Sequence, residues 1–236
     1  MGIFKIEVLK NGKSINSLKD WSDFAGPMKK NHSKDGRSAN ELANYILDGK
    51  GYLPKEIEDI LLEIGCKNDK IFKGEPEKIT SLVGRGTGRH HDLLLEQEDE
   101  IVVGIEAKAD EPLGKTISKE LSVSNISENK LNRINTLYKN LYGCDVSSDT
   151  DIRYQLLTGV NGTLIEAKTK NIPKALFLII TFKKEGSYTE KNLNSNMKDI
   201  DSFLNSLHKN KVGNAYKFNA YKGVTLYIEH IEIDVK

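Results

Sequence analysis

Hydrophobic residues recur along the chain with the spacing of amphipathic helices in five segments. These segments cover about residues 39–46, 54–64, 131–141, 152–167 and 197–207. In the first segment Ser38 is the expected N-cap, and Glu41 stands three residues later, which is the spacing of a capping box. Pro54 suits the opening of the second helix because its fixed φ already fits a first helical turn.

Strand patterns occur between these helices. Residues 3–9 alternate well enough for a strand, and a short strand is expected near residues 79–83. The segment 175–182 is apolar throughout, as expected for a central strand covered on both faces. In residues 224–235 the apolar residues change from even to odd positions, which predicts a β-bulge in a long closing strand.

An acidic turn separates two apolar segments near the middle of the chain. Residues 93–95 and 101–105 are almost entirely apolar, and three acidic residues centred on Asp99 lie between them. A hairpin centred on Asp99 places Asp92, seven residues before the centre, opposite Glu106, seven residues after it. Directly opposed residues share a face of the sheet, with Cβ atoms roughly 4.5–5.5 Å apart.

A lysine joins this pair of carboxylates. Lys108 follows Glu106 by two positions and therefore points to the same face of the sheet. Two opposed carboxylates are destabilising unless a positive charge lies between them. A divalent cation would satisfy both carboxylates, and an amine beside that cation suits the activation of water.

Overall composition excludes several classes of protein. The chain has 35 basic and 34 acidic residues and a formal charge of +1, so any basic surface for nucleic acid must be local. Cys66 and Cys144 stand far apart, which disfavours a disulfide framework or a thiolate zinc site and is typical of a reducing compartment. No signal-peptide pattern occurs, and no apolar run approaches the ~18–20 residues of a membrane span. We expect a soluble cytoplasmic protein without a membrane partner.

The length of 236 residues fits one domain covering residues 1–236. Its core is expected over about residues 36–182. Residues 110–150 are rich in Lys, Ser and Asn and are interpreted as an insertion or lid. Residues 190–236 would add a C-terminal helix–strand extension.

The order of helix, strand, hairpin, helix and central strand resembles that of the PD-(D/E)xK nuclease superfamily. Asp92 and the tripeptide Glu106-Ala107-Lys108 carry the resemblance, which covers about residues 36–182. His91 stands where that superfamily's motif has proline. The resemblance implies an α/β fold with a restriction-endonuclease-like mixed central β-sheet flanked by helices.

Three further segments are similar to those of an uncharacterised bacterial family within this superfamily. They are Gly-Arg-Ser-Ala at residues 36–39, Asp-Glu-Pro at 110–112 and Ile-Arg-Tyr-Gln-Leu-Leu at 152–157.

The resemblance implies a role for each of the central residues. Asp92, Glu106 and the Ala107 carbonyl would bind Mg²⁺, which Mn²⁺ could replace, and Glu41 would complete the shell directly or through water. Mg²⁺ prefers a few carboxylates together with water and substrate phosphate. The metal would polarise the scissile phosphate, and Lys108 would position or deprotonate the attacking water. The alternatives are a solvated ladder of charges for the carboxylates and a simple salt bridge for Lys108.

Polar residues outside the hairpin are assigned in the same way. Gln155, which borders the buried stripe of its helix, could orient the metal-bound water, and Arg153 could grip a phosphate oxygen. Arg85 and Arg89 lie in a glycine-rich segment before the hairpin and could contact a nucleic-acid backbone. The alternatives are a solvated helix flank, ordinary surface arginines and, for Glu41, a local capping role. Basic residues before the first helix could also form a substrate-facing rim or a solvated surface: Lys29, Lys30, Lys34 and Arg37.

These observations predict a Mg²⁺-dependent nuclease that hydrolyses phosphodiester bonds. The resemblance favours DNA over RNA as the partner and a setting in restriction or phage defence. A homodimer would supply two active sites for the two strands of a duplex. Two alternatives stay open: a catalytically inactive nuclease-fold module that binds nucleic acid or protein, and an RNA-cutting toxin.

Overall fold

The computed structural model describes residues 2–25, 37–186, 188–207, 210–212, 214–221 and 223–235. Three of the basic rim residues, Lys29, Lys30 and Lys34, lie outside the described residues. The helices are α1 (Leu18–Ala25), α2 (Ser38–Leu47), α3 (Lys55–Glu63), α4 (Ile117–Leu121), α5 (Glu128–Tyr142), α6 (Tyr154–Thr169) and α7 (Glu190–Ser206). The strands are β1 (Ile6–Lys10), β2 (Lys13–Ser14), β3 (Phe72–Thr80), β4 (Arg89–Gln97), β5 (Ile101–Lys108), β6 (Lys174–Lys183), β7 (Asn210–Val212), β8 (Ala215–Tyr221) and β9 (Val224–Asp234).

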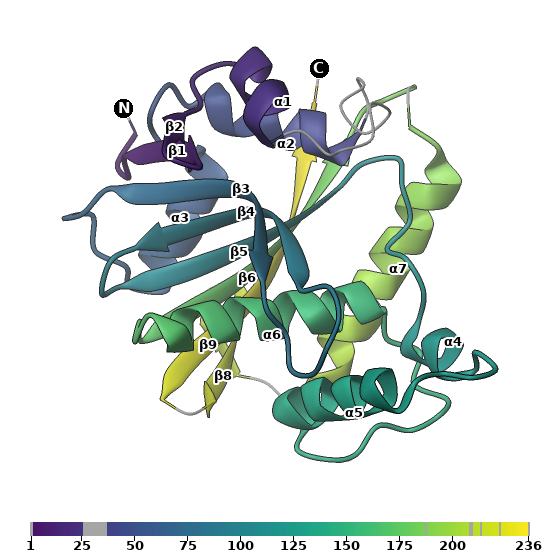
Figure 1. The fold of residues 1–236 in the computed structure, drawn as a ribbon. Coiled ribbons are helices and arrows are strands. Elements are labelled where there is room, and N and C mark those ends of the chain that lie inside the picture. The colour runs from purple at the N-terminus through teal and green to yellow at the C-terminus, as the bar shows by residue number, and fades with distance from the viewer. Residues whose placement is uncertain are drawn as a thin grey trace.

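Within the described residues, all nine strands join one sheet in the order β2-β1-β3-β4-β5-β6-β9-β8-β7 (Figure 1). β5, β6 and β9 run parallel to one another, whereas β3, β4 and β5 are antiparallel neighbours. The sheet is therefore mixed, and helices cover both of its faces. This confirms the expected α/β class with a mixed central sheet flanked by helices.

The sheet separates two hydrophobic cores. The first lies against α1, α2 and α3, and the second lies against α5, α6 and α7 (Figure 1). Along β5, Val103 and Ile105 belong to the first core and Val102 to the second. Along β6, Leu178 belongs to the first core and Phe177 to the second. Strands buried on both faces need a continuous apolar run, so the central strand expected at residues 175–182 is confirmed.

α6 packs against the sheet through very close contacts. A Cβ atom added at Gly159 would lie 2.4 Å from the Phe177 ring, and one added at Gly104 would lie 2.1 Å from Thr163 Oγ1. Glycine at these positions lets the helix and the sheet approach closely. The close approach fixes the start of α6 beside the carboxyl end of β5.

Two sequence predictions at the ends of elements were wrong. α2 begins after Arg37 rather than Ser38 as N-cap, and no side-chain bond caps it. The strand expected near residues 79–83 is the end of the longer β3, which stops at Thr80. The first half of β3 does alternate buried and more exposed positions, but Gly74 and Pro76 occupy two of the buried positions, so its sequence lacks the apolar alternation that marks a strand.

The bulge predicted in the closing strand is also absent from the pairing of β9 with β6. The register runs without a shift from Lys174–Thr225 to Lys183–Asp234. The apolar positions change because the first half of β9 buries its even residues in the second core, whereas Ile231 packs on the first core. The irregularity lies instead between β8 and β9.

The polar region at residues 110–150 contains α4 and α5. The helix expected over residues 131–141 is confirmed within α5, which buries Ile134 and Leu137 in the second core while Leu131 stays exposed. Among the described helices, none combines the length and the apolar character that a bilayer span requires.

Candidate functional site

The β4–β5 hairpin has the register that the sequence predicted. The paired residues run from Gln97–Ile101 to Leu93–Ile105, and Asp99 in the turn has a φ of +61°. Beyond Leu93 the Asp92 side chain takes over the contact between the strands, because its Oδ2 accepts a hydrogen bond of 2.7 Å from the Ala107 amide. The first part of β4 is thus held to the last part of β5 by the Asp92 carboxylate.

Glu106 and Lys108 form a buried ion pair at the carboxyl end of β5. Glu106 has no exposed surface and Lys108 is 5% exposed. Lys108 Nζ lies 2.7 Å from Glu106 Oε1. The second carboxylate oxygen of Glu106 contacts the guanidinium of Arg89, which is itself buried at the start of β4. One carboxylate is therefore shared by two cations.

Burial and neighbouring carboxylates act on these cations in opposite directions. Burial lowers the pKa of Lys108, while Asp92 and Glu111 oppose that change. Burial also lowers the pKa of Arg89, against the attraction of Asp92 and Glu77. An amine with a lowered pKa exchanges protons more readily near neutral pH, which is the property required of a general base or acid.

Glu77 is an additional carboxylate that the sequence analysis missed. It lies in β3 with a φ of +49°, which is uncommon for a residue with a side chain. The Lys10 amine donates to the carbonyls of Pro76 and Glu77 at 2.8 and 2.9 Å and so holds this bend. Burial and the charge of Asp92 raise the pKa of Glu77 to about 7. A proline inside a strand marks an irregularity, and Pro76 is the signal that could have located Glu77.

Glu41 is bound by the segment that precedes α7. It is buried on α2 and accepts a hydrogen bond of 2.8 Å from the Tyr188 hydroxyl, so it does not close the predicted capping box. Burial, the bond to Glu41 and the charges of Glu111 and Asp110 raise the pKa of Tyr188. Tyr188 thus links Glu41 to the segment that follows β5.

α7 holds that segment by hydrogen bonds along one helix face. Asn196 donates to the Glu111 carbonyl at 2.8 Å and accepts from the Leu113 amide at 3.2 Å. The Thr189 amide donates to Asp110 at 2.9 Å. Glu111, which the sequence analysis did not assign, acts electrostatically on Lys108. It follows β5 by three residues, and an acidic residue so close to the motif could have been considered.

The start of α6 completes the surroundings of the site. Arg153 donates to the Gly114 carbonyl at 2.7 Å and forms an ion pair of 2.7 Å with Asp199. Gln155 Oε1 lies 3.8 Å from the position that a Cβ at Gly114 would take. Arg153 therefore joins α6, α7 and the segment after β5, and its phosphate-binding role stays a prediction.

The structure brings the predicted residues together unevenly. Asp92, Glu106, Ala107 and Lys108 lie together, whereas Glu41 is bound by Tyr188 and Gln155 lies beside Gly114. Arg89 lies inside the site and not on the surface loop where a phosphate contact was expected. Arg85 is exposed on the loop between β3 and β4.

His91 occupies the position of the motif proline as a packed, neutral residue. It has no exposed surface and lies against Gly104 and Gly162. Burial, assisted by the charge of Arg89, lowers its pKa to about 3. His90 is exposed, so the two histidines face different surroundings, as alternation along a strand requires.

The carboxylate and carbonyl oxygens of Asp92, Glu106 and Ala107 are the hard donors that Mg²⁺ prefers. Over the described ranges, however, no three His, Cys, Asp or Glu residues are already arranged to hold a metal ion. The ion pair between Arg89 and Glu106 also occupies a carboxylate oxygen that a cation would need. The donor set fits Mg²⁺ once Arg89 moves away from Glu106.

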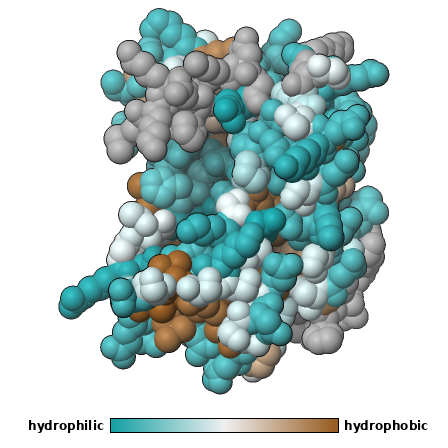
Figure 2. Space-filling model, turned by 90° about the vertical axis from the view of Figure 1, so that its right-hand side faces the viewer, coloured by the Kyte–Doolittle hydropathy of each residue, from teal (hydrophilic) through white to brown (hydrophobic). Residues whose placement is uncertain are grey.

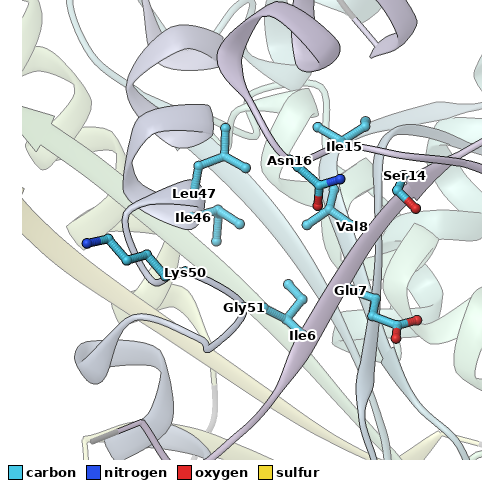
Figure 3. Close-up of a pocket in the computed structure, with 10 residues that line it drawn as sticks. All are labelled: Ile6, Glu7, Val8, Ser14, Ile15, Asn16, Ile46, Leu47, Lys50 and Gly51. Atoms are coloured by element: carbon cyan, nitrogen blue, oxygen red, sulfur yellow. The ribbon is translucent and has the colours of Figure 1, made fainter.

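The face of the molecule on the side of α7 is drawn in Figure 2. Figure 2 shows that this face is hydrophilic over most of its area and hollowed near its centre. A separate cavity of about 400 Å³ lies between β1, β2 and the end of α2 (Figure 3). Ile6, Ile15 and Ile46 line it, with Glu7 and Lys50 at its edges, and none of the carboxylates of the site reaches it.

Comparison with known proteins gives one match. No curated protein and no solved structure shows significant similarity to the chain. One family model matches residues 14–235, which include the hairpin, α6 and α7. The chain therefore belongs to the family described as a domain of unknown function, DUF6946.

Proposed function

We propose that this protein is a Mg²⁺-dependent nuclease of the PD-(D/E)xK type that hydrolyses phosphodiester bonds, with DNA favoured over RNA. The observation that carries the proposal is the buried Glu106–Lys108 pair, 2.7 Å apart, beside the Asp92 carboxylate, where β5 ends and its antiparallel neighbour β4 begins. Burying a lysine and a glutamate costs several kcal/mol of desolvation, and their mutual attraction offsets this cost only when the geometry of the pair is good. Titratable groups with such shifted properties concentrate at functional sites.

Each residue of the site has a chemical task in this proposal. Asp92, Glu106 and the Ala107 carbonyl would hold the ion, with Glu41 at the edge of its shell. When bound, Mg²⁺ supplies charge to polarise the phosphate and to lower the pKa of water. Lys108 takes or returns a proton at its Nζ atom, for which its lowered pKa is suited.

The setting is proposed on the same basis. Cleavage of a duplex on both strands favours a homodimer, because each chain supplies one site. A cytoplasmic role in restriction or phage defence is consistent with this activity.

One observation favours a second candidate, a catalytically inactive module that binds nucleic acid or protein. Arg89 already neutralises Glu106, as an arginine would in a site that has replaced its metal by an internal cation. The two candidates differ in whether a divalent cation can displace Arg89.

Nicking of supercoiled plasmid in Mg²⁺, Mn²⁺ or EDTA tests the proposal. Wild-type protein should nick in the presence of metal, and Asp92→Ala and Lys108→Ala should each lower the rate by about 100-fold or more. Glu98→Ala is the matched control, since that carboxylate is exposed in the hairpin turn. Equal nicking by all variants would indicate contamination and end the nuclease assignment. Single-stranded DNA and RNA offered in parallel identify the preferred substrate.

A further inference from the structure

An arginine of α5 binds three backbone carbonyls of the glycine-rich loop between β3 and β4. Arg133 donates to the carbonyl oxygens of Val83, Arg85 and Thr87 at 2.9, 2.7 and 3.0 Å. Its side chain is buried, with the residue only 8% exposed. The carbonyls of every second residue from 83 to 87 therefore point toward the Arg133 guanidinium.

A second α5 residue binds the same loop from one turn earlier in the helix. Asn129 accepts from the Arg85 amide at 2.8 Å and donates to the Arg85 carbonyl at 2.6 Å. Both backbone groups of Arg85 are thus bound, whereas its side chain is exposed. These two bonds hold the backbone of Arg85, the loop's charged residue, while its guanidinium faces solvent.

Glycine is required where α5 approaches the loop. Gly84 and Gly86 have φ values of +81° and +122°. A Cβ at Gly84 would lie 2.8 Å from Asn129 Oδ1, and one at Gly86 would lie 3.3 Å from Arg133 Nη2. The sequence of the loop is therefore matched to these two helix residues.

We propose that Arg133 and Asn129 are positioning residues that hold the loop as a preformed arm and present Arg85 to the sugar–phosphate backbone of a nucleic acid at the site. The inference rests on the proposed nuclease function and names the arm that grips its substrate. Figure 1 shows the β3–β4 connection extending across α6 to α5. The same connection leads directly into Arg89, which contacts Glu106.

Two physical effects support this role. Carbonyl oxygens that faced a phosphate would repel it, and Arg133 turns three of them away from solvent. Ordering a flexible loop costs about 1–2 kcal/mol per residue, and binding is stronger when that ordering precedes the encounter. α5 orders the loop in the free protein, so the nucleic acid does not have to.

The test measures binding of a duplex in EDTA over a range of salt concentrations. Arg85→Ala should weaken binding and lower the slope of log K against log salt by about 1, because one phosphate contact is lost. Arg133→Ala should produce the same decrease in slope although Arg133 is buried, and the double variant should show no further decrease. Arg133→Lys should fall between wild type and Arg133→Ala. Lys139→Ala, an exposed residue of the same helix, is the control.

Hydrogen exchange of the amides of residues 84–88 provides the second measurement. It should accelerate in Arg133→Ala and Asn129→Ala and stay unchanged in Lys139→Ala. If Arg133→Ala does not fold, Asn129→Ala and Arg133→Lys are measured in its place, since each removes fewer hydrogen bonds to the loop. Unchanged binding in the Arg133 and Asn129 variants, or additive slopes in the double variant, would overturn the inference while wild-type nicking persists. A wild type that neither binds nor nicks nucleic acid refutes the proposed function itself.

Discussion

Arg89 contacts the carboxylate of Glu106 that would hold a divalent cation in the proposed function. Glu106 is fully buried between the Arg89 guanidinium and the Lys108 amine, so its charge is balanced without a metal. A buried charge that loses its partner costs several kcal/mol, and a bound cation would restore the balance. If the site binds Mg²⁺ as proposed, the Arg89 side chain should weaken that binding.

Arg89→Ala is expected to increase the affinity for Mn²⁺ by about tenfold, because the internal competitor is removed. The apo variant should be less stable than wild type and should gain more stability from Mn²⁺, since ligand binding stabilises by mass action. Calorimetric titration and the metal-dependent shift in Tm measure both effects. An Arg89→Ala protein that binds Mn²⁺ no better than wild type would favour the inactive module.

Glu77 makes stability depend on pH in an unusual direction. Its pKa is about 7 in the folded protein, against an ordinary value of 4.5, so the folded state holds the proton more tightly between these values. Stability from this group is lost as the pH rises through that window. Glu77→Gln, which does not titrate, should be more stable than wild type by about 1–3 kcal/mol at pH 8 and equal to it near pH 4. Urea unfolding in EDTA at both values gives the comparison, and a difference that grows toward acid pH would refute it.

The central residues could be predicted from sequence because strand alternation and a two-strand register are local properties. Asp92, Glu106 and Lys108 were located from the turn at Asp99 alone. Pro76 marks an irregularity beside Glu77, but the sequence does not show that Glu77 interacts electrostatically with Asp92, because Lys10 from another strand holds the left-handed backbone of Glu77. Contacts between distant segments leave no periodic pattern.

At the scale of elements, the glycines of α6 determine where the helix lies on the sheet. Helix propensity alone predicts that Gly159→Ala stabilises an α-helix by about 1 kcal/mol. The structure predicts the opposite sign, because the new methyl would lie 2.4 Å from the Phe177 ring in a tightly packed core. α6 would have to move, and the start of α6 would move with it.

Gly159→Ala should therefore lower the free energy of unfolding by about 1–3 kcal/mol. Lys168→Ala, at an exposed position of the same helix, should change it by less than about 0.5 kcal/mol. Urea denaturation with a constant m-value tests both. A stabilised Gly159→Ala protein would show that the helix can shift without cost.

Element types were predictable where a helix or strand is buried on one or both faces, as for α3, α5 and β6. The ends were less predictable. Ser38 and Glu41 have the spacing of a capping box, yet Tyr188 binds the Glu41 carboxylate, so a tertiary contact replaced a local one. The apparent bulge in β9 arose because that strand packs against different cores at its two ends.

At the scale of the whole molecule, the sheet and its two cores place the polar groups of the site where several segments meet. The three segments singled out by resemblance are far apart in sequence. Asp110 and Arg37 nevertheless interact electrostatically, and Arg153 bonds to the Gly114 carbonyl. α7, which lies outside the core expected at residues 36–182, and the Thr189 that precedes it bind two of these segments, through Asp110 and Arg153.

The reactivity of the two cysteines toward a thiol reagent measures how often the first core opens to solvent, because Cys66 is part of that core and Cys144 is exposed. Cys66 is buried, and burial raises the pKa of its thiol to about 12, whereas Cys144 is exposed. Thiolate is the reactive form, so Cys66 should react only when the structure opens. Native protein should show one rapidly reacting thiol with a disulfide reagent, and denatured protein should show two. Cys144→Ser should abolish the rapid phase and leave a slow phase whose rate increases with urea in parallel with unfolding. Rapid labelling of Cys66 in native buffer would mean that α3 separates from the sheet far more easily than its packing against the first core implies.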